Sequence, residues 1–270
     1  MFSSLRFLVL IYAAVLVLVF ICQRQLQYHP AKSMEGGPAR YNVPEMREIT
    51  VRTKDGLSLL GWYAPPKEDK PVVVLFHGNA GHIGDRGYKA RHLMDAGYGV
   101  LLAEYRGYGG NPGNPDEKGF YSDARAFMSW LMQEKIPEKQ MVLYGESIGS
   151  GVAVQMAVEH ESIAALILEA PFSSALDVGQ GVYWWLPVRY LMVDKFMSID
   201  KIGDVHAPLL ILHGDNDKVV PFKLGRKLFE ASNNPKTFVE IKDGGHSDLY
   251  DFGAAGIVTE FLERLSQPGQ

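Results

Sequence analysis

Residues 141–149 read MVLYGESIG, and this stretch predicts both the fold and the chemistry of the chain. The apolar run at 141–144 is typical of a buried strand, and residues 148–160 have the small and apolar side chains of a buried helix. Between them, GESIG at 145–149 matches the G-x-S-x-G pattern, in which a serine lies on a sharp strand-to-helix turn. We therefore expect Ser147 to be a nucleophile. The alternative, a glycine-rich helix start, does not require a serine at its centre.

Strand and helix patterns alternate on both sides of this turn. Before it, the sequence predicts a hairpin over 48–53 and 57–64, strands over 72–76 and 99–105, and helices over 85–96 and 115–133. After it come strands over 164–168, 209–212 and 237–241 and helices over 223–231 and 251–265. Repeated β-α-β units imply an α/β fold: a mostly parallel open sheet with helices on both faces, and the hairpin as an antiparallel edge.

Residues 171–205 interrupt this alternation. The stretch is rich in large apolar side chains, including Tyr183, Trp184 and Trp185, and it has no strand pattern. Insertions of this length between strands are usually functional or disordered, and the aromatic content argues against disorder. We expect a small lid in which these three aromatic residues contact a substrate.

A nucleophilic serine needs a base, and the base needs an acid that orients it. Catalytic groups in an open parallel sheet gather at the carboxyl ends of the strands. The loop after strand 209–212 carries Asp215 and Asp217, and the loop after the last strand carries His246 behind two glycines. We expect His246 to be the general base. Asp217 is favoured as the acid because it lies deeper in its loop, and Asp215 is the alternative.

An acyl-transfer site also needs two N–H donors for an oxyanion. The residue after the nucleophile, Ile148, supplies the first. The second is expected from HGNAG at 77–81, which follows a buried strand, with the backbone N–H of Asn79 as the candidate. A phosphate-binding role for this loop is disfavoured because no Lys-Ser/Thr pair follows it.

Residues 7–22, FLVLIYAAVLVLVFIC, contain no charge. As a helix they would span about 24 Å, somewhat less than the roughly 30 Å of a hydrocarbon core, and flanking arginines can reach the interfaces. We predict a transmembrane signal anchor over 1–24, a polar tether over 25–44 and a catalytic domain over 45–270. The alternative is a cleaved signal peptide, but the bulky residues at 19–22 do not form a small-x-small cleavage site.

The sidedness of the anchor has two opposing signals. Basic residues after the span favour a cytoplasmic domain, whereas a very short basic N-terminus before an apolar run is typical of an export signal. No cysteine follows Cys22, which fits an oxidising compartment. We expect a single-pass membrane protein with its catalytic domain on the extracytoplasmic side.

The composition limits the partners. With 47% hydrophobic and 21% charged residues, the 270-residue chain is neither disordered nor a miniprotein stapled by disulfides. Its net charge of −4 combines +3 over residues 1–44 with −7 over the rest, so nucleic acid is not an expected partner. The single cysteine forms no internal disulfide, and neither a metal nor an organic cofactor is expected.

Three strings outside the turn, FHGNAG at 76–81, YRGYG at 105–109 and EAPF at 169–172, are similar to those of a known family. With GESIG they resemble the α/β-hydrolase superfamily, over about residues 45–270. Within it they resemble the membrane-anchored, serine aminopeptidase-like hydrolases related to the fission-yeast bud-emergence homologue and mammalian α/β-hydrolase-domain proteins. The resemblance implies the α/β-hydrolase fold.

The same resemblance assigns roles to two loops. The family pattern H-G-x-x-D-x-x-V-P falls on residues 213–221 and implies that Asp217 is the acid. The pattern G-H-x-D/N falls on residues 245–248 and implies that His246 is the base. Members of the family often carry Arg or Gln before the nucleophile, where this chain has Glu146.

Together these observations predict a serine hydrolase that cleaves carboxylic ester or thioester bonds through Ser147, His246 and Asp217. The expected substrate is a small molecule, a lipid or an acylated protein. One alternative is a serine peptidase or amidase, as the name of the subgroup implies. Another is a non-catalytic binding module tethered to a membrane, against which the complete set of three catalytic residue types argues.

Overall fold

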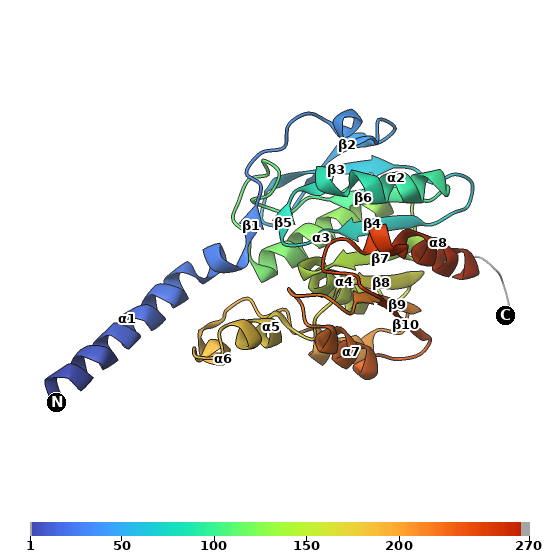
Figure 1. The fold of residues 1–270 in the computed structure, drawn as a ribbon. Helices are drawn as coiled ribbons and strands as arrows, with labels where there is room; N and C mark the ends of the chain where they lie inside the picture. Colours follow the sequence, from blue (N-terminus) through green and yellow to red (C-terminus); the bar gives the residue numbers. More distant parts are fainter. Residues whose placement is uncertain (1, 266–270) are drawn as a thin grey trace.

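A computed structural model describes residues 2–265 of the chain, and its centre is an eight-stranded sheet (Figure 1). The strand order is β10-β9-β8-β7-β4-β6-β3-β2, in which β3 pairs antiparallel with β2 and β6 and the other neighbours are parallel. This confirms the predicted α/β fold class. The strands are β2 Arg47–Arg52, β3 Ser58–Ala64, β4 Val72–Phe76, β6 Gly99–Ala103, β7 Met141–Glu146, β8 Ala165–Glu169, β9 Leu209–Gly214 and β10 Lys236–Ile241.

Helices cover both faces of the sheet, so the core has two halves. On β4, Val72, Val74 and Phe76 belong to one buried cluster and Val73 and Leu75 to the other. A strand that buries both faces has no polar positions, which explains its unbroken apolar run. The first half is covered by α3 Glu117–Gln133, α4 Ile148–Glu159 and α7 Phe222–Ala231, and the second by α2 Gly87–Asp95 and α8 Ala254–Leu265.

The predicted lid region, residues 171–205, joins β8 to β9 without adding a strand. It contains helices α5 Ala175–Val182 and α6 Val188–Leu191, followed by the short 3-10 helices η4 Ser198–Asp200 and η5 Ile202–Asp204. In Figure 1, α5 and α6 lie on the same side of the domain as the N-terminal helix. The sequence pattern did not indicate helices here because α6 has only four residues and α5 carries two glycines among its eight.

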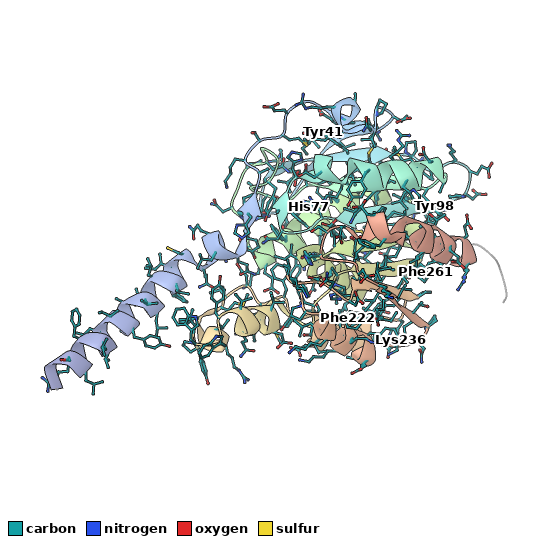
Figure 2. All side chains as sticks on the ribbon, in the orientation of Figure 1. Tyr41, His77, Tyr98, Phe222, Lys236 and Phe261 are labelled. Carbon is teal, nitrogen blue, oxygen red and sulfur yellow. The ribbon has the colours of Figure 1, made fainter. Side chains whose placement is uncertain are left out.

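The N-terminal helix α1, Phe2–Gln27, extends outward from the domain, and its N-terminal end lies far from the sheet (Figure 1). Its residues Ser4–Gln27 are long and apolar enough to cross a membrane, a property that signal sequences share. Most of the large apolar side chains between residues 5 and 12 of this helix are exposed, and Figure 2 shows side chains standing out from α1 on more than one side.

The predicted tether, residues 25–44, packs against the domain instead of standing free of it. Tyr28 and Val43 are buried in the two halves of the core. The two-residue strand β1 His29–Pro30 pairs in parallel with β5 Ala80–Gly81. Two buried apolar residues are enough to hold this polar stretch against the domain, and the average composition of the stretch does not reveal them. Other short elements of the described residues are η1 Pro38–Tyr41, η2 Ile83–Arg86, η3 Glu138–Gln140 and η6 Leu249–Phe252.

Helix α4 approaches the sheet so closely that Gly149 should not tolerate a side chain. A Cβ atom there would lie 2.0 Å from the carbonyl oxygen of Phe76. We expect Gly149→Ala to lower the free energy of unfolding by about 1–3 kcal/mol through overpacking, measured by thermal unfolding of the full chain in detergent. The matched control is Gly256→Ala in α8, where a Cβ meets nothing within 4 Å and alanine should stabilise the helix slightly. Equal effects of the two changes would contradict the prediction.

Candidate active site

Ser147 lies on the turn between β7 and α4 in a strained backbone conformation, with φ of 52° and ψ of −117°. An L-residue rarely adopts such a positive φ, and strain of this kind concentrates at functional sites. The turn is held by a 2.9 Å hydrogen bond from the N–H of Ser147 to the carbonyl oxygen of Glu169 on β8. Gly145 is required beside it, since a Cβ there would lie 2.5 Å from the carbonyl oxygen of Gly149.

His246 and Asp217 meet Ser147 from two other loops. The Nε2 atom of His246 lies 2.9 Å from the Oγ of Ser147, and its Nδ1 atom lies 2.7 Å from Oδ2 of Asp217. These residues follow β10, β9 and β7, which are far apart in the sequence but end at one edge of the sheet. The arrangement lets Nδ1–H donate to the carboxylate while Nε2 accepts the serine proton.

Asp217 is held as a carboxylate by its loop. Its Oδ1 atom accepts hydrogen bonds of 2.8 Å from the N–H groups of both Val219 and Val220. Burial raises the pKa of this carboxyl, but hydrogen bonds from His213 and His246 outweigh that effect and hold the pKa well below its usual range. Asp215, the alternative acid, is exposed and makes no contact with His246 in the described residues.

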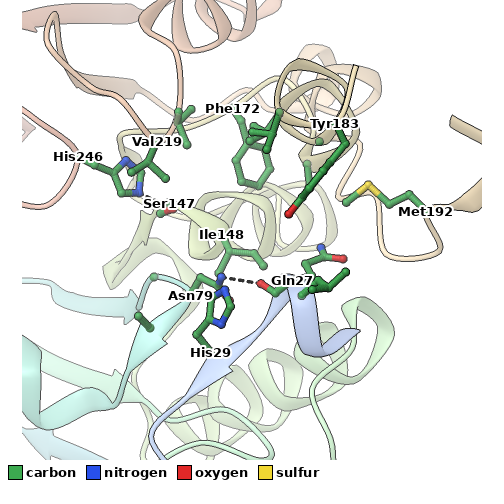
Figure 3. Close-up of a pocket in the computed structure, with 18 of the residues that line it drawn as sticks. Gln27, His29, Asn79, Ser147, Ile148, Phe172, Tyr183, Met192, Val219 and His246 are labelled. Atoms are coloured by element: carbon green, nitrogen blue, oxygen red, sulfur yellow. Dashed lines mark hydrogen bonds between the residues drawn. The ribbon is translucent and has the colours of Figure 1, made fainter. Parts of the chain in front are cut away.

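A cavity of about 630 Å³ opens beside Ser147 and His246 (Figure 3). Ile148 and Asn79 also line it, next to the serine. The side-chain amide of Asn79 donates a 2.6 Å hydrogen bond to the backbone carbonyl oxygen of Gln27. The backbone carbonyl oxygen of Asn79 accepts a 2.9 Å hydrogen bond from the hydroxyl of Tyr108. These two contacts hold the loop of Asn79 in place at the cavity wall.

The aromatic run of the predicted lid divides between two surfaces. Tyr183 lines the cavity, as expected. Trp184 and Trp185 do not line it; they are 81% and 49% exposed on the outer surface of the 171–205 segment. In this structure the two tryptophans therefore face away from the cavity, and their contact with a substrate stays a prediction. An aromatic run without a clear helical period does not reveal which side chains face inward.

The N-terminal segment supplies part of the cavity wall, which the sequence reading missed. Five residues of this segment line the cavity together with residues of the 171–205 segment: Val19, Gln23, Leu26, Gln27 and His29. The first four recur at the spacing of one helix face. Gln23 and Gln27, four residues apart at the polar end of the helix, were the signal that this face has a polar partner.

A cluster of buried charges lies directly behind the nucleophile. In the β7–β8 ladder Glu146 pairs with Glu169, which would place two carboxylates side by side. The Nζ atom of Lys89, whose side chain is 1% exposed, lies 2.7 Å from both carboxylates, and Arg86 donates a 2.6 Å hydrogen bond to Glu146. Tyr144 donates a hydrogen bond to Glu169.

The cations neutralise Glu146. Burial raises the pKa of its carboxyl, but the charges of Lys89 and Arg86 dominate and hold that pKa far below its usual range. Burial lowers the pKa of Lys89, and the two glutamates reverse this and raise it. Glu146 is therefore an ion-paired support of the turn and presents no free negative charge to a substrate.

The loop that carries Asn79 has its own buried support. His77 lies inside the domain (Figure 2), where its Nε2 atom is 2.8 Å from Oε1 of Glu104. The other oxygen of Glu104 accepts a 2.9 Å hydrogen bond from the N–H of Ile83. Arg106 binds Asp123 and Asp55. These groups brace the loops near the nucleophile.

Comparisons with known proteins agree with this architecture. Residues 67–198 match the family model described as serine aminopeptidase, S33. Human α/β hydrolase domain-containing protein 17B is 32% identical over 225 residues, covering 80% of this chain and 73% of that protein. The chain belongs to the α/β-hydrolase superfamily.

Two further relatives extend the comparison. The lysophosphatidylserine lipase ABHD12 of Danio rerio is 33% identical over 196 residues, which cover 65% of this chain and 51% of the lipase. The structure of an esterase from Pyrococcus furiosus superimposes with a TM-score of 0.71 at 21% identity, covering 88% of this chain and 98% of the esterase. The second likeness shows the shared hydrolase fold.

The charge cluster generates a prediction about stability. Lys89→Met leaves two buried carboxylates without their shared cation, so we expect the free energy of unfolding at pH 8 to fall by about 3–5 kcal/mol. The control is Lys227→Met, which removes a partly exposed ion pair with Asp177 and should change stability by less than about 1 kcal/mol.

The two proteins should also respond to pH in opposite directions. The lowered pKa of Glu146 stabilises the wild-type fold above the ordinary glutamate pKa, and this contribution is lost as the pH falls. In Lys89→Met, burial should raise the pKa of the uncompensated carboxyls, so stability should be lost as the pH rises from 5 to 8. Thermal unfolding from pH 2 to pH 8 measures both responses: the wild type should lose stability as the pH falls below about 4.5, and Lys89→Met should lose it between pH 5 and 8. Parallel profiles would refute the assignment.

Proposed function

We propose that this protein is a serine hydrolase that cleaves carboxylic ester or thioester bonds through an acyl-enzyme. The observation that carries the proposal is the continuous contact from Ser147 Oγ to His246, at 2.9 Å, and from His246 to Asp217, at 2.7 Å. Ser147 and His246 line a cavity, and Ser147 lies on a strained turn, which is what nucleophilic catalysis requires.

In the proposed reaction, Ser147 attacks the acyl carbon while His246 takes its proton. The N–H groups of Asn79 and Ile148 stabilise the oxyanion that forms. His246 then protonates the leaving alcohol or thiol, which departs and leaves the acyl group on Ser147. Water, deprotonated by His246, releases the acid and restores the serine. Asp217 keeps the imidazole in its working tautomer and stabilises its protonated form.

Two observations bear on the choice of bond. The name of the lipase relative supports a carboxylic ester, whereas the family description, serine aminopeptidase, favours an amide. The cavity is lined mainly by aliphatic and aromatic side chains near the 171–205 segment. That lining favours an acyl chain over a charged peptide end, so the ester is proposed and the peptidase is the second candidate.

We further propose that α1 anchors the enzyme in a membrane with the catalytic domain on the extracytoplasmic side. The span Ser4–Gln27 supports the anchor by its length and hydropathy. A reporter active only in the cytoplasm, fused after Gln270, should give no signal, and cytoplasmic activity of the reporter would reverse the orientation.

The catalytic assignment predicts the effects of three substitutions. Ser147→Ala should abolish turnover of p-nitrophenyl butyrate, and Asp217→Asn should lower kcat by about 10⁴-fold because the imidazole loses its orienting partner. The matched control is Asp215→Asn, which removes an exposed carboxyl of the same loop and should retain near wild-type kcat. A larger loss of kcat from Asp215→Asn than from Asp217→Asn would show that Asp215, and not Asp217, is the acid that orients His246.

Covalent labelling separates the enzyme from a binding module. A fluorophosphonate reacts with an activated serine, so the wild-type chain should be labelled at Ser147 and the Ser147→Ala chain should not. Mass spectrometry of the labelled peptide identifies the residue. A chain that binds ligand but takes up no label at Ser147 would favour the binding module.

A further inference from the structure

The C-terminal half of α1 is fastened to the 171–205 segment by polar contacts. Arg24 donates two hydrogen bonds, of 2.8 and 3.3 Å, to the carboxylate of Asp194, which is 3% exposed. Gln27 donates a 2.9 Å hydrogen bond to the carbonyl oxygen of the same aspartate. Gln23 accepts one of 2.7 Å from the N–H of Val193 and donates one of 3.2 Å to the carbonyl oxygen of Leu191. These contacts fix the helix and the segment relative to each other.

The contact continues along the part of α1 proposed to lie in the membrane. Leu16 and Val19 pack on a buried cluster of Leu176, Leu186 and Val188. Still further from the domain, the hydroxyl of Tyr12 donates a 3.1 Å hydrogen bond to the carbonyl oxygen of Trp185. Tyr12 precedes Gln27 by about 22 Å of helix. The segment therefore runs beside the candidate span for most of that length, and it would enter the membrane with it.

The outer surface of the segment suits lipid. Six large apolar or aromatic side chains of the segment are exposed: Val182, Tyr183, Trp184, Trp185, Tyr190 and Val193. Two of them, Val182 and Tyr183, also line the cavity. Between residues 178 and 193 the only charged residue is Arg189. Tryptophan and tyrosine concentrate at membrane interfaces, and an exposed apolar patch on this scale marks an interaction surface.

The cavity continues from the catalytic residues to this contact. In Figure 3, Ser147 and His246 lie on one side of the cavity, and Tyr183 and Met192 lie on the other. Val19 of α1 lines the cavity and packs in the same apolar cluster as Met192. The far wall of the cavity is thus built jointly by the anchor and the segment that runs beside it.

We propose that residues 175–193 enter the same lipid leaflet as the C-terminal half of α1. The cavity then opens into that leaflet and admits the acyl chain of a membrane-resident ester. The chain lies between α1 and α5–α6, with Val19 bounding its far end, while the ester carbonyl reaches Ser147. The hydrolysis in this statement rests on the proposed function, whereas the position of the segment in lipid does not.

The first experiment locates the segment. The full-length chain is reconstituted in phosphatidylcholine vesicles with bromine atoms on the acyl chains, which quench tryptophan fluorescence on contact. We expect strong quenching that is lost in the double variant Trp184→Phe/Trp185→Phe and retained in the control Trp130→Phe. No quenching, or equal quenching in the double variant and the wild type, would overturn the proposal.

The second experiment tests the cavity wall. Val19→Trp should lower kcat/KM for a p-nitrophenyl palmitate embedded in the vesicles at least tenfold and leave p-nitrophenyl butyrate within twofold. The control Leu18→Trp adds the same side chain on an exposed position of the same helix, outside the cavity lining, and should change neither.

The outcomes separate this inference from the proposed function. An equal loss of kcat/KM on both esters in Val19→Trp, or an equal effect of Leu18→Trp, would contradict the assignment of Val19 to the far wall of the acyl-chain site. The proposed hydrolysis would still stand. Absence of turnover on every ester in the wild-type chain overturns the proposed function, and the quenching result still decides whether the segment lies in lipid.

Discussion

The approach of helix α4 to the sheet is the constraint on which the site depends. Without side chains at Gly145 and Gly149, the start of α4 lies directly against the backbone of β7 and β4. That proximity forces the connecting residue, Ser147, into a positive φ and brings its hydroxyl to the edge of the sheet. Because β9 and β10 run parallel to β7, the loops that follow them reach the same edge. The position of His246 and Asp217 thus follows from the topology.

A strained turn needs surroundings that hold it, and the buried charges behind Ser147 provide them. Ion pairs in a core contribute little net stability, because desolvation offsets most of their attraction. Their contribution here is geometric: Lys89 on α2 ties Glu146 on β7 to Glu169 on β8, and Ser147 is hydrogen-bonded to the backbone of that same Glu169. The cluster therefore fixes the relative position of the three elements that meet at the nucleophile. Apolar side chains in place of these charged residues would fill the same space but would not fix the positions of α2, β7 and β8 relative to one another.

The sequence was sufficient to predict the sheet because buried parallel strands are continuous apolar runs, and β4 reads as one. It was also sufficient to name the loops that carry His246 and Asp217, since chain order and strand ends determine them. It was insufficient for Trp184 and Trp185, whose exposure depends on how α5 and α6 dock. The packing of Tyr28 and Val43 was likewise hidden, because two apolar residues in a polar stretch leave no periodic signal. Glu146 appeared as an unexplained departure from its relatives until the structure placed Lys89 and Arg86 beside it.

The polar residues of α1 argue that the helix is more than an anchor. A helix that only crosses a bilayer gains nothing from amides and guanidinium groups on one face, since each polar group in an apolar environment lowers stability unless it finds a partner. Gln23, Arg24 and Gln27 all find partners on the segment that covers the cavity, and Gln27 also accepts a hydrogen bond from Asn79 at the nucleophile. The same helix turn thus contacts the lid region and the loop proposed to stabilise the oxyanion. In the proposed membrane arrangement, a span attached in this way would transmit its position in the membrane to the proposed catalytic groups, whereas a flexible tether would leave the domain free to turn its cavity away from the lipid.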